Sequence, residues 1–137
     1  MQTTIDRAPG DERTAILGLD GELDASNYQG VIDAASGLYA DGARRLVVDL
    51  SSLSYMSSSG LVCLHALALL FRGQAPPDPE AGWDAIHSIG LDADAGERVA
   101  EVKLVSPQAN VARVLDRTGL GQYFEVHPDR ASAIASF

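Results

Sequence analysis

The fold of this chain is decided by the stretch Leu46-Val47-Val48-Asp49-Leu50-Ser51-Ser52-Leu53-Ser54-Tyr55-Met56-Ser57-Ser58-Ser59-Gly60-Leu61. Its first residues form a short, valine-containing apolar run, which predicts a buried strand over residues 45–50. Residues 61–71 are nearly free of charge and contain neither glycine nor proline, which predicts a helix. The serines between them therefore lie where a strand passes into a helix.

A serine at the start of a helix has two compatible roles. Its oxygen can accept a hydrogen bond from a free first-turn N–H group, which is ordinary helix capping. The same N–H groups and the helix dipole also stabilise an anion, so a phosphate on Ser58 would be well accommodated. Both roles stay open on the residues alone.

Outward from this stretch, short apolar runs alternate with helical patterns, which is typical of a sheet covered by helices. Strands are predicted near residues 3–6, 15–19, 45–50, 102–105 and 123–126. Helices are predicted after Asp24 as far as Asp41-Gly42, over residues 61–71, from Pro107 to Gly119, and over residues 128–135. The predicted fold class is α/β, with a mixed sheet of about five strands covered by about four helices in a single domain over residues 1–137.

Residues 73–98 do not follow the alternation of strand and helix patterns, because they contain several prolines, glycines and acidic side chains. We interpret them as an insertion between the second helix and the next strand. Such a long loop is usually functional or disordered. A short amphipathic helix over residues 80–88 and simple disorder both stay open. A calcium loop is rejected, because the glycine at position 96 comes one place early and Lys103 stands where the closing glutamate belongs.

The net charge of the chain and its N-terminal residues argue against direct nucleic-acid binding and against membrane insertion. The chain has 19 acidic and 10 basic side chains and a formal net charge of −9, so it should repel nucleic acid. Residues 1–10 contain no basic stretch followed by an apolar run, and residues 61–71 are too few to span a bilayer. A cytoplasmic location without membrane insertion is expected.

Metal and redox chemistry are not expected. Cys63 is the one cysteine of the chain, so no internal disulfide can form, and its apolar helix predicts packing. His65 lies among apolar residues and is expected to be a core histidine. His87 and His127 fall in separate regions, and no metal-ligand spacing links the three. No cofactor is predicted.

An enzyme is also not expected. A serine on a strand-to-helix turn is shared with the nucleophile elbow of hydrolases, which needs a glycine two places before and two places after the serine. Around Ser58 these positions are Met56 and Gly60, so half of the motif is missing. The sequence also lacks a glycine-rich phosphate loop with its lysine. The chain is predicted to act by binding.

The serine stretch forms part of a wider pattern, which includes Gly21-Glu22-Leu23-Asp24, Ser106-Pro107, Val114-Leu115, Thr118-Gly119-Leu120 and Tyr123-Phe124. In order and spacing these motifs resemble the STAS family of anti-sigma factor antagonists over nearly the whole chain. The resemblance implies a protein that binds an anti-sigma factor with serine kinase activity and so releases a sigma factor. The kinase then phosphorylates the antagonist, and a serine phosphatase is a further partner that could reset the switch.

The resemblance also implies the site residues. The family's phosphoacceptor falls on Ser58, with Ser57 and Ser59 as alternatives, and the implied partner surface comprises Asp24, Ser57, Ser58, Ser59, Gly60 and Leu61. The family commonly has aspartate where this chain has Ser57. Asp24 is expected to cap the first helix, to line this surface, or both. Asp49 is expected to accept hydrogen bonds from neighbouring loop N–H groups, although a lysine or arginine of a partner could use it.

A second functional class stays open. A STAS adaptor subunit of a transport or signalling assembly would use the same surface without a phosphorylation cycle. Ser57 and the insertion both favour this alternative.

Overall fold

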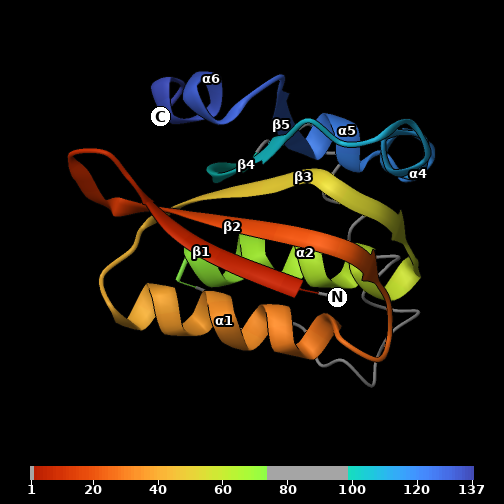
Figure 1. Ribbon diagram of the computed structural model, residues 1–137, viewed down its shortest axis with the longest axis horizontal. Coiled ribbons are helices and arrows are strands. Elements are labelled where there is room, and N and C mark those ends of the chain that lie inside the picture. Colours follow the sequence, from red (N-terminus) through yellow and green to blue (C-terminus); the bar gives the residue numbers. More distant parts are fainter. Residues whose placement is uncertain (1, 74–98) are drawn as a thin grey trace.

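Five strands form one mixed sheet in the computed structural model, which describes residues 2–73 and 99–137 (Figure 1). The strands are β1 (Gln2–Ala8), β2 (Asp11–Leu23), β3 (Arg45–Met56), β4 (Val99–Val105) and β5 (Phe124–His127), and they are ordered β1-β2-β3-β4-β5. β1 is antiparallel to β2, whereas the other neighbouring pairs are parallel. The predicted mixed sheet is confirmed.

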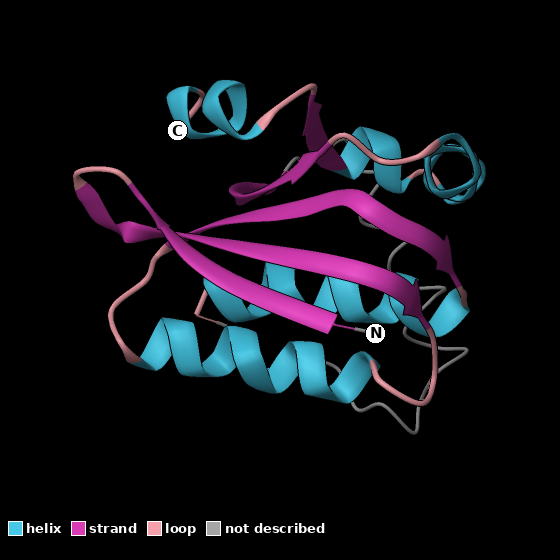
Figure 2. Cartoon of the chain, viewed as in Figure 1, coloured by secondary structure: helices cyan, strands magenta, loops and turns pink. Residues whose placement is uncertain are grey.

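The helices of the described chain are α1 (Tyr28–Ala40), α2 (Ser58–Phe71), α4 (Ala109–Thr118), α5 (Leu120–Tyr123) and α6 (Arg130–Ala135). Figure 2 shows α1 and α2 side by side beneath the sheet, with α6 on the other side. The apolar residues of α4 and α5 join the same core as those of α1 and α2, whereas α6 packs in a separate, smaller cluster. The helices therefore cover the two faces of the sheet unequally.

The alternation of side chains along β3 separates these two faces. Leu46, Val48 and Leu50 belong to the large core under α1 and α2. Val47 points the other way and packs in the small cluster that includes Ala133 of α6. Asp49, two residues after Val47, lies on that second face.

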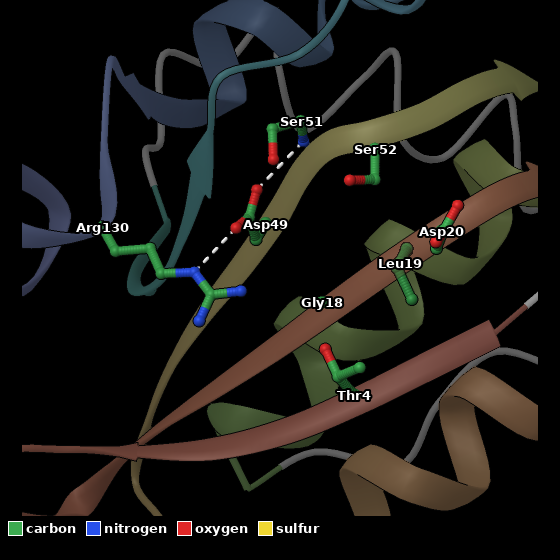
Figure 3. A pocket seen from close by; sticks show the side chains of 8 residues that line it. All are labelled: Thr4, Gly18, Leu19, Asp20, Asp49, Ser51, Ser52 and Arg130. Atoms are coloured by element: carbon green, nitrogen blue, oxygen red, sulfur yellow. Dashed lines mark hydrogen bonds and ion pairs between the residues drawn. The ribbon is translucent and has the colours of Figure 1, made fainter.

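Arg130 fastens α6 to the second face of the sheet (Figure 3). Its Nε donates to Asp49 Oδ2 at 2.7 Å, and its Nη1 donates to Asp6 Oδ2 at 3.3 Å. The other carboxylate oxygen of Asp49 accepts from the backbone N–H of Ser51 at 3.0 Å. The predicted hydrogen bond from a neighbouring N–H is confirmed, and the cation that uses Asp49 comes from the chain itself.

Helix α2 is buried along most of its length, as its apolar sequence predicted. Every residue from Gly60 to Ala68 is buried, including Cys63 and His65. Burial raises the pKa of the Cys63 thiol to about 12, so this side chain is inert at neutral pH. The ring of His65 lies 6.0 Å from that of Tyr123 in the core.

Several predicted boundaries were wrong. β2 and β3 run on past residues 19 and 50. At the end of β3, buried Leu53 and Met56 are each preceded by two exposed residues, so this part is not an apolar run. α4 begins two residues after Pro107, and α5 was not predicted. α6 begins at Arg130, where Asp129 caps it by accepting from the N–H of Ser132 at 2.7 Å.

Other expectations fall on residues that the structure does not describe. The insertion over residues 73–98, with its helix over residues 80–88, lies outside the described chain apart from Gly73. His87 also lies there. Both interpretations of this segment stay open.

The pairing of Asp49 predicts an acid-dependent loss of stability. Burial raises the pKa of Asp49, but hydrogen bonds from Ser51 and Arg130 outweigh it and leave the pKa below its ordinary value of 3.8. The pairing therefore contributes stability above that value, and the contribution is lost as pH falls through the lower, folded-state pKa. We expect the stability difference between wild type and Asp49→Asn, measured by urea unfolding, to shrink as pH falls below 3.8.

Arg130→Gln should show the same trend, because it removes the other half of the pair. A stability difference that stays constant with pH for both variants would contradict this account of Asp49.

Candidate functional site

The candidate site lies where β2 and β3 end next to one another. Leu23 and Met56, the last residues of these parallel strands, are paired in the sheet. The N–H of Ser57 then donates to the carbonyl of Leu23 at 2.9 Å. Asp24 and Ser57 therefore leave the sheet from neighbouring positions, which brings the two predicted parts of the site together.

Asp24 shapes the loop between β2 and α1. Its carboxylate accepts from both the N–H and the hydroxyl of Ser26, and its own N–H donates to Asn27 Oδ1 at 3.0 Å. The bonds from the Ser26 side chain and then its backbone lower the pKa of Asp24, so the group is charged at neutral pH. The N-cap of α1 is Asn27, so the expectation that Asp24 caps this helix was wrong.

The three serines differ in exposure and contacts at the start of α2. Ser58 is the first helical residue and is exposed, whereas Ser57 and Ser59 are half-buried. Ser57 occupies the N-cap, but its side chain makes no cap bond, and its shielded Oγ has no hydrogen-bond partner in the described chain. The prediction that serine oxygens cap this helix was therefore wrong.

The first backbone N–H groups of α2 remain available. The N–H groups of Gly60 and Leu61 donate to the carbonyl of Ser57 at 3.0 and 3.3 Å. Those of Ser58 and Ser59 donate to no acceptor within residues 2–73 and 99–137. This is the arrangement in which a helix start receives an anion.

Gly60 and Leu61 support the site from below, because both are buried. A Cβ added at Gly60 would lie 2.3 Å from Met56 Cγ and 3.2 Å from Leu23 Cδ2. The absence of a side chain therefore lets α2 approach the ends of both strands. The exposed surface of the predicted set is formed by Ser58, with half-buried Asp24, Ser57 and Ser59 beside it.

Tyr55 was not among the predicted site residues. It precedes the serines on β3, is paired with Glu22 of β2, and leaves 49% of its surface exposed. Exposed aromatic side chains are enriched at protein interfaces. Its place among the serines that follow the apolar run of β3, next to buried Met56, is the sequence signal that could have identified it.

Side chains from the start of α4 fix the end of β3. Gln108 Nε2 donates to the carbonyl of Ser51 at 3.0 Å, and Asn110 Nδ2 donates to that of Ser54. The Ser54 hydroxyl donates to the carbonyl of Gly21 on β2 at 3.0 Å. The strand that leads into the serines is therefore held on both sides.

A small polar hollow lies on the second face of the sheet (Figure 3). None of Ser57, Ser58 and Ser59 lines it. It has a volume of about 110 Å³ and is lined by Thr4, Gly18, Leu19, Asp20, Asp49, Ser51, Ser52 and Arg130. Cofactor sites usually have volumes of about 300–1,000 Å³. Asp49 and Arg130 pair with one another across it, so we assign this hollow no ligand.

No group of three or more His, Cys, Asp or Glu side chains that could hold a metal ion is found in the described part of the chain. Among the helices of residues 2–73 and 99–137, none is long and apolar enough to cross a membrane.

Gly60→Ala should destabilise the fold by about 1–3 kcal/mol, because the new methyl group overlaps Met56. Gly37→Ala is the matched control, since Gly37 is an exposed residue of α1 and a Cβ there would meet nothing within 4 Å. This substitution should stabilise the fold by about 0.5–1 kcal/mol. Urea unfolding measures both changes. Equal effects of the two variants would show that the close approach at Gly60 is not a constraint.

Ser57→Ala should change the free energy of unfolding by less than about 0.5 kcal/mol, because it removes a hydroxyl that makes no bond. Asp129→Ala removes a formed N-cap bond and should cost more than Ser57→Ala. Thermal unfolding of both variants gives the comparison. A larger loss at Ser57 would show that its hydroxyl does bond in solution.

A family model described as "Mlab, STAS domain" matches residues 7–75, which is about half of the 137-residue chain. No curated protein matches the chain. An anti-sigma factor antagonist from Mycobacterium paratuberculosis has 18% identity and a TM-score of 0.68, with 98% of this chain and 92% of that chain covered.

Two structures of SpoIIAA are also similar. The unphosphorylated form of this anti-sigma factor antagonist has 19% identity and a TM-score of 0.62, with 97% of this chain and 93% of that chain covered. The phosphorylated form of the Bacillus protein has 18% identity and a TM-score of 0.55, with coverages of 98% and 97%. At these identities the structures establish a shared fold. The family model matches half of the chain, and the chain therefore belongs to the STAS domain family.

Proposed function

We propose that this chain is an anti-sigma factor antagonist that is switched off by phosphorylation of Ser58. In the unmodified state, the start of α2 and the Asp24 loop bind an anti-sigma factor with serine kinase activity, which releases a sigma factor. The exposure of Ser58 on the first turn of an otherwise buried helix is the observation that carries the proposal. The proposed location of these partners and of this chain is the cytoplasm.

Burial favours Ser58 over its neighbours as the phosphoacceptor. A kinase needs an accessible hydroxyl, and Ser58 is exposed, whereas Ser57 and Ser59 are half-buried and Ser57 Oγ is shielded. Residues 60–68, directly behind the site, are all buried. A phosphate on Ser58 can therefore alter the surface without entering the core.

The charges around Ser58 explain how a phosphate would end the complex. It would add nearly two negative charges close to the Asp24 loop, whose carboxylate is held in its charged form by Ser26. The residues of the proposed surface carry no cation to offset them. Burying such a dianion against a partner without matching cations costs several kcal/mol, and each 1.4 kcal/mol weakens binding about tenfold.

The similar structures support this proposal at the level of the fold. SpoIIAA has been described in an unphosphorylated and in a phosphorylated form, and both have the fold of this chain. In the proposed cycle, a serine phosphatase removes the phosphate and restores binding. The chain itself acts as a ligand and kinase substrate, and not as an enzyme.

A phosphorylation-independent adaptor of a transport or signalling assembly is the second candidate. Two features of the sequence favour it: Ser57 stands where the STAS family commonly has aspartate, and residues 73–98 are an insertion between the second helix and the next strand. An adaptor would use the same exposed surface, including Tyr55, with the serines serving only as part of the helix start.

Ser58→Glu should bind the partner at least about tenfold more weakly than Ser58→Ala, because only the former adds charge at the contact. The partner is first captured from native cell lysate with the unmodified protein and identified by mass spectrometry. Affinities of the purified proteins are then measured by calorimetry. Incubation with the captured kinase and ATP should place a phosphate on Ser58 and not on Ser58→Ala protein.

Ser52→Glu is the matched control, since it adds the same charge at an exposed serine that lines the hollow on the second face. It should bind as the wild type does. Equal affinities of Ser58→Ala and Ser58→Glu would refute the switch. Recovery of membrane or scaffold components by both variants would assign the adaptor role instead.

A further inference from the structure

Four basic residues of this acidic chain line one hollow of the surface. Of its 10 basic residues, Arg13, Arg44, Arg45 and Lys103 line a single hollow of about 510 Å³. The rest of the lining is Ala100, Glu101, Glu125, Ser136 and Phe137. We propose that this hollow binds a small organic anion that carries at least two negative charges.

The hollow lies at the opposite end of β3 from the serines. Arg45 is the first residue of β3, whereas Ser57 follows its last residue, and Figure 1 shows the start of β3 on the side where the C-terminus lies. A ligand here would not occupy the surface proposed for the anti-sigma factor. The inference is therefore independent of the proposed function.

The backbone places Arg13, Arg45 and Lys103 on three adjacent strands, with Arg44 directly before β3. Arg45 is paired with Thr14, the residue after Arg13, and the N–H of Arg44 donates to the carbonyl of Arg13 at 2.8 Å. Lys103 on β4 is paired with Val47 of β3. Sheet pairing thus fixes the spacing of the Cα atoms that carry these side chains before any ligand binds.

The carboxylates of the lining are already engaged. Glu125 forms an ion pair with Lys103, and Glu101 forms one with Arg72 at 3.5 Å. Lys103 is buried and paired, so it contributes little net charge to the hollow. The three arginines are left as the source of an attractive field.

Each arginine retains capacity for an anion. Arg44 donates to backbone carbonyls and stacks on the Tyr39 ring at 3.9 Å, and no carboxylate of residues 2–73 and 99–137 forms an ion pair with it. Arg45 is half exposed and meets Asp11 only at 3.6 Å. Arg13 is exposed and forms no ion pair within the described residues. Guanidinium groups bind phosphate and carboxylate oxygens in a bidentate manner.

The size and the apolar wall favour an organic anion over a bare ion. The volume of about 510 Å³ falls within the range of about 300–1,000 Å³ typical of small-molecule sites. The half-buried ring of Phe137 forms one wall, with Arg45 Cζ 5.7 Å and Lys103 Nζ 5.4 Å from its centroid. A phosphate ester or a dicarboxylate with a hydrocarbon part would use both features.

The test is calorimetric titration of the full chain, at low salt, with phenyl phosphate, inorganic phosphate and glutarate. We expect saturable binding to one site, tighter for phenyl phosphate than for inorganic phosphate because its ring can contact Phe137. Comparison with glutarate separates a phosphate ester from a dicarboxylate. Arg45→Gln and Arg13→Gln should each weaken binding about tenfold.

Arg117→Gln removes an exposed arginine of α4 outside the hollow and should leave the affinity within about twofold. Arg13→Gln keeps the test valid if Arg45→Gln fails to fold, since Arg13 makes no ion pair. No saturable binding of any probe, or equal weakening by Arg117→Gln, would overturn the proposal. Binding of a polyglutamate peptide alone would also overturn it and assign the surface to an acidic protein partner.

Discussion

The burial of α2 is the constraint on which the rest of the structure depends. Its residues 60–68 are all buried, and the helix contacts α1, β3 and β4. Close-packed interiors resist small displacements. The exposed first turn is therefore held in place by a core that its chemistry does not reach, and a partner meets a surface that is already formed.

The two faces of the sheet carry different kinds of side chain, and the helices cover them unequally. The face under α1 and α2 is apolar and closed. The other carries a short apolar patch under α6, and beside it a carboxylate that the sheet shares with Arg130. A buried charge needs a partner, so the position of α6 is specified by an ion pair as well as by packing.

The elements on either side of the serine turn could be predicted from the sequence, because they depend on the residue types of neighbouring positions. The apolar run at Leu46 and the uncharged helix after Ser59 placed β3, α2 and the serine turn between them. The sequence did not separate Asp24 from Asn27 as the cap of α1, because both residue types cap helices and both precede the same apolar stripe. The end of β3 was missed because its buried residues Leu53 and Met56 are three positions apart, which is not the period of two that predicts a strand.

Other features depend on pairings that no local pattern contains. Asp49 meets Arg130 across 81 positions of sequence, and the basic hollow gathers residues from β2, β3, β4 and β5 and from the two residues after α6. Exposure also separates the three serines, although their residue type is identical. These properties arise only when the strands have been ordered and aligned, so a single sequence could not supply them.

The strand order has a consequence for how this chain can change in length. β2, β3, β4 and β5 are parallel neighbours, so each helix returns the chain to the same end of the sheet before the next strand starts. The connection between Gly73 and Val99 is therefore attached where parallel strands begin, and Ser58 stands where they finish. A change in the length of the chain between Gly73 and Val99 would therefore meet the fold at the end of the sheet farthest from the serine turn.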